Sequence, residues 1–149
     1  MATVSGIIRI LVVEDFEMFR QFLSSTLESR PEFVIAEASD GLEAVSRAER
    51  LQPDLILLDI GLPRLNGIAA ARRIRKLSPA SKIIFVTQEF DLDVVREALD
   101  LGAWGYIAKI HADIDLMAAV DAVLAGRHFV SSVLSARGVT TQSLTVSGD

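Results

Sequence analysis

Short apolar runs alternate along this chain with stretches in which apolar residues recur every three or four positions. The apolar runs predict strands over five segments: Ile7–Val13, Phe33–Ala38, Leu55–Leu58, Lys82–Val86 and Trp104–Ala108. The periodic stretches predict helices over roughly 16–30, 40–51, 66–77, 91–101 and 113–125. Because strand and helix alternate five times with short connections, we expect an α/β fold with a parallel sheet, right-handed crossovers and helices on both faces.

The same pattern gives the residues at helical spacing in the first helix and the inward-facing residues of the second. In the first helix the candidates at helical spacing are Phe16, Phe19, Phe22, Leu23, Thr26 and Leu27. In the second helix, Leu42, Val45 and Leu51 are expected to point inward. Asp40 is the expected N-cap of this second helix, with Glu43 in the position that completes a capping box.

The run Leu55–Leu58 stands out because it is entirely apolar and leads directly into Asp59. A continuous apolar run of this length is typical of a strand that is buried on both faces of a parallel sheet. In open sheets of this kind, ligands bind just beyond the carboxyl ends of the strands. Asp59 falls at such an end, and an ionised carboxylate there needs a partner because burying an unpaired charge is costly.

Composition narrows the class of protein. The chain has 149 residues, half of them hydrophobic, which predicts one domain with a full core. It contains no cysteine, which excludes disulfides and thiolate sites and fits a cytoplasmic location. No apolar run approaches the roughly 18 residues of a membrane span, and the first residues do not resemble a signal peptide. The net charge of −5 disfavours direct nucleic-acid binding.

Polar side chains follow four of the predicted strands. Glu14 and Asp15 end the first, Asp59 the third, Thr87 the fourth and Lys109 the fifth. Because the carboxyl ends of parallel strands share one edge of a sheet, we expect these groups to converge. Clustered carboxylates repel one another unless a cation offsets their charge, and Mg²⁺ (or Mn²⁺) prefers such oxygen ligands. With a lysine and a hydroxyl nearby, Asp59 can act as a nucleophile that forms an acyl phosphate.

These residues resemble the receiver domain of two-component response regulators over roughly residues 7–130. Glu14–Asp15 resembles the acid pair of that family, and Asp59 resembles its phosphoacceptor. Thr87, Tyr106 and Lys109 resemble its switch hydroxyl, switch aromatic residue and lysine. The resemblance implies a flavodoxin-like (βα)5 doubly wound sandwich, with a five-stranded parallel sheet in the order 2-1-3-4-5.

The resemblance also implies roles for these residues and partners for the protein. A sensor histidine kinase or histidine phosphotransfer protein would donate a phosphoryl group to Asp59. Magnesium would be held by Glu14, Asp15, Asp59 and the backbone carbonyl of Ile60. Movement of Thr87 and Tyr106 would then change the surface of the fourth helix, fifth strand and fifth helix. A second copy of the chain or a downstream output protein would bind this surface, with no role for nucleic acid or membrane.

Three loop residues depart from the family pattern or flank the expected phosphoryl group. Gln88 stands where the family usually has a small residue, and Gly61 and Glu89 occupy flanking positions. We hypothesise that these residues set access to Asp59 and the lifetime of the phosphorylated state. Residues 131–149 are rich in Ser, Thr, Gly and Val, which predicts a tail or linker. The preceding stretch resembles the receiver end of regulators that carry a helix-turn-helix output.

Two alternatives remain open at this point. The chain could be a receiver-like interaction module that is not phosphorylated, an idea that Gln88 supports. A flavodoxin-like cofactor binder is disfavoured because Glu14–Asp15–Phe16 is acidic where a phosphate-binding loop would be needed. The role of Trp104 is also open, since this side chain could pack on the fourth helix or serve as an exposed anchor for a partner.

Overall fold

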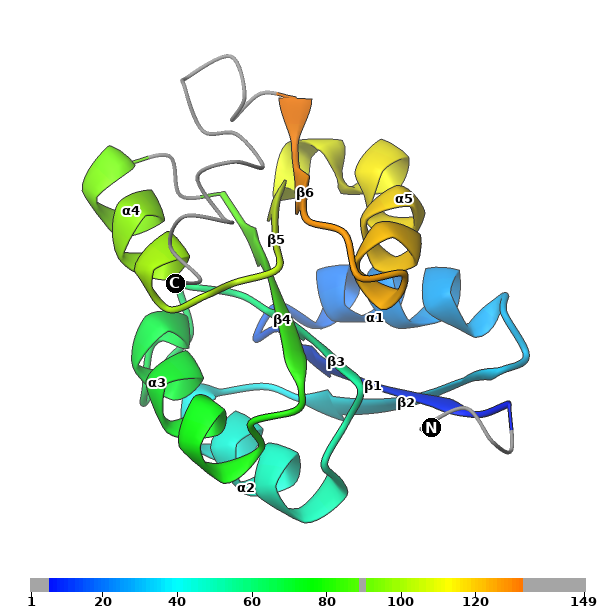
Figure 1. Cartoon of the computed structure of the whole chain (residues 1–149), viewed down its shortest axis with the longest axis horizontal. Helices are drawn as coiled ribbons and strands as arrows, with labels where there is room; N and C mark the ends of the chain where they lie inside the picture. Colours follow the sequence, from blue (N-terminus) through cyan, green and yellow to red (C-terminus); the bar gives the residue numbers. More distant parts are fainter. Residues whose placement is uncertain (1–5, 89–90, 133–149) are drawn as a thin grey trace. The chain divides into compact units, whose positions relative to one another are not determined.

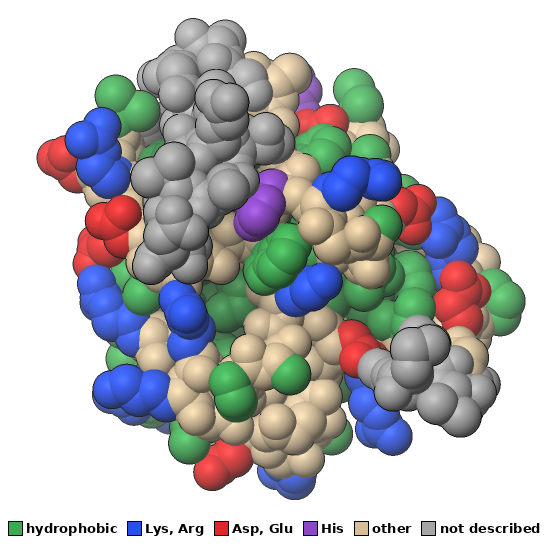
Figure 2. All heavy atoms as spheres, viewed as in Figure 1, with side chains coloured by type: hydrophobic (Ala, Val, Ile, Leu, Met, Phe, Trp, Pro, Cys, Tyr) green, Lys and Arg blue, Asp and Glu red, His purple; other side chains and the backbone are tan. Residues whose placement is uncertain are grey.

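The computed structural model (Figure 1) describes residues 6–88 and 91–132. Glu89 and the expected tail beyond residue 132 lie outside the described residues. The chain divides into two compact units, residues 1–82 and residues 83–149, and each is described by itself. Figure 2 shows one face of the molecule, where acidic and basic side chains are interspersed and hydrophobic side chains remain visible between them.

The first unit contains three parallel strands in the order β2-β1-β3. They are β1 (Ile8–Val13), β2 (Phe33–Ala38) and β3 (Leu55–Leu58). Val13 is in register with both Ala38 and Leu58, so the three strands end together at one edge. All four residues of β3 are buried, as expected for a strand covered on both faces.

Three helices cover the two faces of these strands. They are α1 (Glu17–Glu28), α2 (Gly41–Leu51) and α3 (Gly67–Leu77). Figure 1 shows α1 on one face of the strands and α2 and α3 on the other. The predicted arrangement of helices on both faces is therefore present within this unit.

The prediction that Leu42 faces the core is wrong, because this side chain is 43% exposed. The buried residues of α2 are the small ones, Gly41, Ala44 and Ala48. A Cβ atom on Gly41 would lie 1.7 Å from the carbonyl oxygen of Leu65, so the backbones approach too closely for any larger residue. The stripe of small residues therefore faces inward and directs Leu42 toward solvent.

Fewer side chains of α1 are buried than recur at helical spacing in the sequence. Leu23, Ser24 and Leu27 are its buried residues. Phe16 is 61% exposed and Phe22 is 37% exposed, although both belong to the series of residues at helical spacing. Leu23 and Leu27 are four positions apart and cover one stripe of the helix, which leaves the phenylalanines at its margin.

The predicted capping box at the start of α2 is confirmed. The backbone N–H of Glu43 donates to Asp40 Oδ1 at 2.8 Å, and the backbone N–H of Ser39 donates to Glu43 Oε1 at 2.8 Å. The bond from Ser39, together with the guanidinium of Arg47, holds the pKa of Glu43 below its usual value. The charged form of Glu43 is therefore the one that stabilises this helix start.

The second unit contains β4 (Lys82–Thr87, whose first residue belongs to the first unit), β5 (Gly105–Ala108) and β6 (Phe129–Val130), in the order β4-β5-β6. Its helices are α4 (Leu92–Asp100) and α5 (Ala112–Leu124), with a 3₁₀ turn η1 (Lys109–His111) between β5 and α5. Both runs of strands agree with the predicted order 2-1-3-4-5. None of the described helices combines the length and the apolar character needed to cross a membrane.

The sixth strand was not predicted, because two residues are too few to show a hydrophobic period. The backbone N–H of Phe129 donates to the carbonyl of Trp104 at 3.1 Å, and that of Ser131 donates to the carbonyl of Tyr106 at 3.0 Å. The buried Ser131 hydroxyl accepts from the Ala108 N–H at 2.9 Å and donates to Asp115 Oδ2 at 2.8 Å.

Trp104 precedes β5 instead of belonging to it. Its ring stacks on the imidazole of His128, with the centroids 4.4 Å apart and the planes at 8°. The side chain is half-buried, and its role as an anchor for a partner stays a prediction.

We predict that Glu43→Gln lowers the unfolding temperature at neutral pH. Because the pKa of Glu43 is lowered in the folded state, its contribution is present above the unfolded pKa and is lost as pH falls through the folded value. The wild-type and variant unfolding temperatures should therefore converge in acid. Thermal unfolding between neutral and acidic pH measures this, with Glu49→Gln on the same helix as control. A difference that persists in acid would contradict the assignment.

Candidate functional site

The first unit gathers three of the predicted acidic residues at the carboxyl ends of β1 and β3. One carboxylate oxygen from each of Glu14, Asp15 and Asp59 lies within 4.8 Å of the others. Glu14 is 1% exposed and Asp59 is 4% exposed, whereas Asp15 is open to solvent. The sequence prediction that these residues converge is confirmed for this set.

Backbone hydrogen bonds place Asp59 at this edge. Its N–H donates to the carbonyl of Val13 at 3.1 Å, which continues the pairing of β1 with β3 past the last strand residue. The N–H of Gly61 donates to Asp59 Oδ1 at 3.2 Å. The carboxylate is therefore held in a fixed direction by its own loop.

Glu14 is held in a similar way. Its N–H donates to the carbonyl of Ala38 at 3.0 Å, and its Oε2 accepts from the N–H of Phe16 at 3.0 Å. These bonds fix both the backbone and the carboxylate at the end of β1. The neighbouring Asp15 offers an oxygen on the exposed side of the cluster.

The donor set fits a divalent cation. Two buried carboxylates and a third within 4.8 Å repel one another when all are ionised. Oxygen ligands of this kind, with one side open to water, are what Mg²⁺ and Mn²⁺ prefer. Glu14, Asp15 and Asp59 are the residues that would hold the ion.

The Ile60 carbonyl, expected as a further ligand, lies in the turn that follows Asp59, and its role toward a cation stays a prediction. This oxygen accepts from the N–H of Leu62 at 2.9 Å and from the N–H of Gly67 at 2.8 Å. Its local role is to close the turn between β3 and α3.

Gly67 has a positioning role that the sequence did not make explicit. A Cβ atom on it would lie 2.0 Å from the carbonyl oxygen of Asp59 and 2.8 Å from the Cα of Ile60. The preceding Asn66 caps α3 by accepting from the N–H of Ala69 at 2.9 Å. The start of α3 therefore packs directly under the Asp59 backbone, which only glycine permits.

The remaining predicted site residues belong to the second unit. Thr87 ends β4 and is 2% exposed, and it is in register with Ala108 of β5. Lys109 follows Ala108 directly, so the hydroxyl and the ammonium come from the same edge of this unit. Tyr106 is fully buried, with its ring 6.0 Å from that of Phe85. Its place in the core is established here, while its role as a switch stays a prediction.

Two of the three residues expected to control access can be placed. Gly61 and Gln88 are both exposed, and a Cβ atom on Gly61 would meet nothing within 4 Å. Their effect on the lifetime of a phosphorylated state stays a prediction.

Comparison with known proteins relates the whole fold to one family. Residues 10–121 match the family model described as response regulator receiver domain. The crystal structure of a two-component response regulator of the LuxR family from Aurantimonas sp. SI85-9A1 is 30% identical in sequence. It superposes with a TM-score of 0.80 and covers 94% of this chain and 96% of that chain. This agreement confirms the predicted flavodoxin-like α/β fold.

Two curated relatives are longer than the part of them that this chain matches. The transcriptional activator protein ExaE of Pseudomonas putida is 34% identical over 85% of this chain and 59% of its own length. A protein-glutamate methylesterase/protein-glutamine glutaminase of Thermotoga maritima is 42% identical over 74% of this chain and 33% of its own length. The chain therefore spans less than two thirds of either relative.

We predict that Gly67→Ala lowers the free energy of unfolding by roughly 1–3 kcal/mol, because the added methyl group forces the Asp59 backbone to shift. Gly61→Ala is the matched control, since its methyl group would enter open space. Urea unfolding of the metal-free proteins measures both changes. Equal unfolding midpoints for the two variants would show that the close approach is not rigid.

Proposed function

Because the chain belongs to the family of response regulator receiver domains, we propose that it is a phosphorylation-dependent switch with Asp59 as the phosphoacceptor. The single observation that carries this proposal is the buried position of Asp59 beside Glu14 and Asp15. A receiver domain is a regulatory domain, so the only chemistry we assign to it is its own phosphoryl transfer and dephosphorylation.

The proposed donor is a phosphohistidine of a sensor histidine kinase or a histidine phosphotransfer protein. An Asp59 carboxylate oxygen forms a bond to phosphorus as the phosphorus–nitrogen bond of the donor breaks, and the departing imidazole takes up a proton. The fixed loop at Asp59 aims its carboxylate for this attack. Bound Mg²⁺ would supply positive charge to the phosphoryl oxygens.

Thr87 and Lys109 are the proposed partners of the phosphoryl group once it is on Asp59. A hydroxyl donates one hydrogen bond and an ammonium supplies a compact positive charge, and phosphoryl oxygens accept both. A shift of Thr87 would change the space available to the buried Tyr106. The surface of α4, β5 and α5 would then differ between the two states.

A second copy of the chain or a downstream output protein is the proposed reader of that surface, in the cytoplasm. Residues 7–130 form the proposed receiver region, and residues 131–149 a tail or linker. The curated relatives have further length that this chain does not match, so their named activities are not assigned to it.

We predict that acetyl phosphate and Mg²⁺ add one phosphoryl group to the wild-type chain, detected by intact-mass spectrometry. Asp59→Asn removes the nucleophile and should abolish the mass increase. Removal of the metal with EDTA should do the same, because no divalent cation then supplies positive charge to the phosphoryl oxygens. Equal labelling of Asp59→Asn would refute the assignment of Asp59. A wild-type chain that gains no phosphoryl group would favour the unphosphorylated interaction module.

We also predict that beryllofluoride with Mg²⁺ changes the fluorescence of Trp104, the single tryptophan of the chain. Its indole stacks on His128 next to β5, so a change in packing there alters its surroundings. Asp59→Asn is the control and should show no change. An unchanged spectrum of the wild type saturated with beryllofluoride and Mg²⁺ would argue against coupling between Asp59 and this surface.

A further inference from the structure

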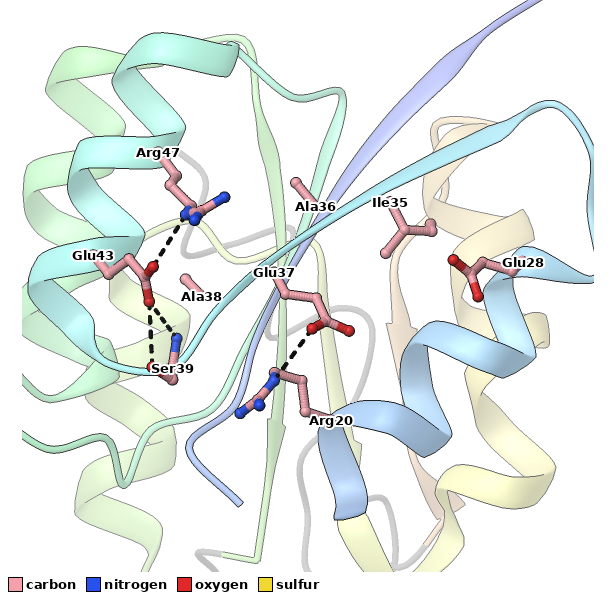
Figure 3. Close-up of a pocket in the computed structure, with 9 residues that line it drawn as sticks. All are labelled: Arg20, Glu28, Ile35, Ala36, Glu37, Ala38, Ser39, Glu43 and Arg47. Atoms are coloured by element: carbon pink, nitrogen blue, oxygen red, sulfur yellow. Dashed lines mark hydrogen bonds and ion pairs between the residues drawn. The ribbon is translucent and has the colours of Figure 1, made fainter. Parts of the chain in front are cut away.

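A polar groove of about 600 Å³ runs along β2 between α1 and α2 (Figure 3). It contains two arginines, each paired with a glutamate. Arg20 Nε lies 3.4 Å from Glu37 Oε1, and Arg47 Nε lies 3.2 Å from Glu43 Oε2. The two pairs are alike in chemistry, and their nitrogen–oxygen distances are similar. They differ in what else the arginine touches.

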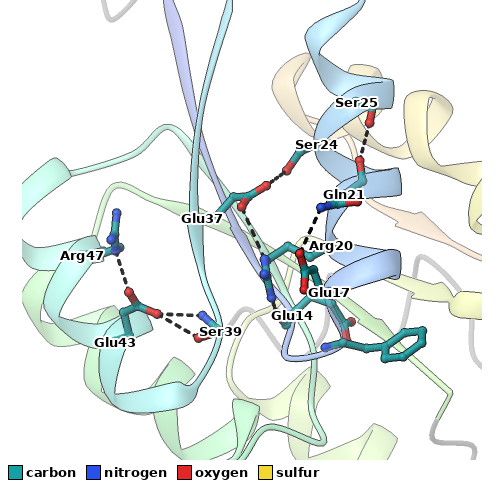
Figure 4. A network of polar contacts seen from close by, with 11 residues as sticks. Glu14, Glu17, Arg20, Gln21, Ser24, Ser25, Glu37, Ser39, Glu43 and Arg47 are labelled. Carbon is teal, nitrogen blue, oxygen red and sulfur yellow. Dashed lines mark hydrogen bonds and ion pairs between the residues drawn. The ribbon is translucent and has the colours of Figure 1, made fainter.

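Arg20 reaches from the groove to the acid cluster. Its Nη1 donates to the backbone carbonyl of Glu14 at 2.9 Å, while its Nε faces Glu37 (Figure 4). The Arg20 side chain is 18% exposed, whereas that of Glu37 is 41% exposed, so the ion pair is only partly shielded from water. The planar guanidinium can make both contacts at once because its donors diverge in a fixed fork.

The far end of this arrangement is also anchored. Glu37 Oε2 accepts from the Ser24 hydroxyl at 2.5 Å, and Ser24 is a buried residue of α1. A continuous polar chain therefore runs from Ser24 through Glu37 and Arg20 to Glu14. By contrast, Arg47 pairs with a residue four positions earlier on its own helix.

From this chain of contacts we infer that Arg20 is a positioning residue for the metal site. The inference rests on the proposed function, since it concerns the cation that Glu14, Asp15 and Asp59 would hold. Arg20 fixes the carbonyl of Glu14, and the Phe16 N–H fixes the carboxylate of the same residue. Together they set the direction in which the acid pair presents its oxygens, so little ordering remains to be done when a cation binds.

The positive charge of Arg20 acts on metal binding in the direction opposite to positioning, and the two effects can be distinguished. A guanidinium near the acids repels a divalent cation, so a pure charge effect predicts that removing it tightens metal binding. Positioning predicts that metal binding weakens even when the charge is retained. Arg20→Lys separates the two, because lysine keeps the charge but cannot span Glu14 and Glu37 with a rigid fork.

The test is the affinity of the full chain for Mn²⁺ alone, followed by its paramagnetic resonance signal, with Mg²⁺ as competitor. Arg20→Lys is expected to raise the dissociation constant about tenfold, at the lower end of the effect of groups that orient metal ligands. Arg47→Lys is the matched control from the same groove and should leave it unchanged. Thermal unfolding without metal establishes that each variant is folded.

Kinetics with acetyl phosphate give a second measurement. Arg20→Lys should raise the Mg²⁺ concentration needed for half-maximal phosphorylation of Asp59 while leaving the rate at saturating Mg²⁺ unchanged. Glu37→Gln keeps Arg20 but removes its anchor, so it should shift the metal dependence in the same direction. Because the two residues act through one chain of contacts, the double variant should be no weaker than Arg20→Lys alone.

The outcomes separate this inference from the proposed function. Wild type that binds no Mn²⁺ would overturn the metal site and the inference with it. Wild type that binds Mn²⁺, with Arg20→Lys unchanged, would overturn the positioning role alone. Tighter binding in Arg20→Gln would also overturn it and identify Arg20 as a repelling charge.

Discussion

Repulsion between two buried carboxylates at the ends of neighbouring strands is the constraint on which the candidate site depends. Glu14 and Asp59 are almost completely shielded from water, so their negative charges are poorly screened. Tight backbone contacts bring them together, including the bond from Asp59 to Val13 and the approach of Gly67 to the Asp59 carbonyl. A divalent cation held by these carboxylates would reduce their mutual repulsion and so stabilise the folded state. Hydrogen bonds from Gly61 and Phe16 hold the Asp59 and Glu14 carboxylates in place at this edge.

Those parts of the molecule that follow from a local pattern could be predicted from the sequence. The apolar run of β3 fixed both the burial of that strand and the position of Asp59 at its carboxyl end. The capping box of Asp40 and Glu43 needs only the residues at its own helix start, and it formed as expected. Alternation of strand and helix predicted a parallel sheet, because a parallel connection needs a crossover.

Other features depend on contacts between distant segments, and no local period reports them. A leucine and an alanine on α2 are equally compatible with an inner face, and the close approach of Leu65 to Gly41 decides between them. The bond from Arg20 to the Glu14 carbonyl joins a side chain to a backbone atom, so it leaves no pattern of residue types. The short strand β6 exists because its backbone pairs with β5, and two residues could not reveal this in advance.

The anchoring of Ser131 has a mechanical consequence for whatever lies downstream of β6. Its hydroxyl joins the N–H of Ala108 to Asp115, and Ala108 immediately precedes Lys109. A displacement of Ser131 is thus transmitted to the end of β5 and to α5 through these two hydrogen bonds. Conversely, a displacement at the end of β5 acts on Ser131 through the same two bonds.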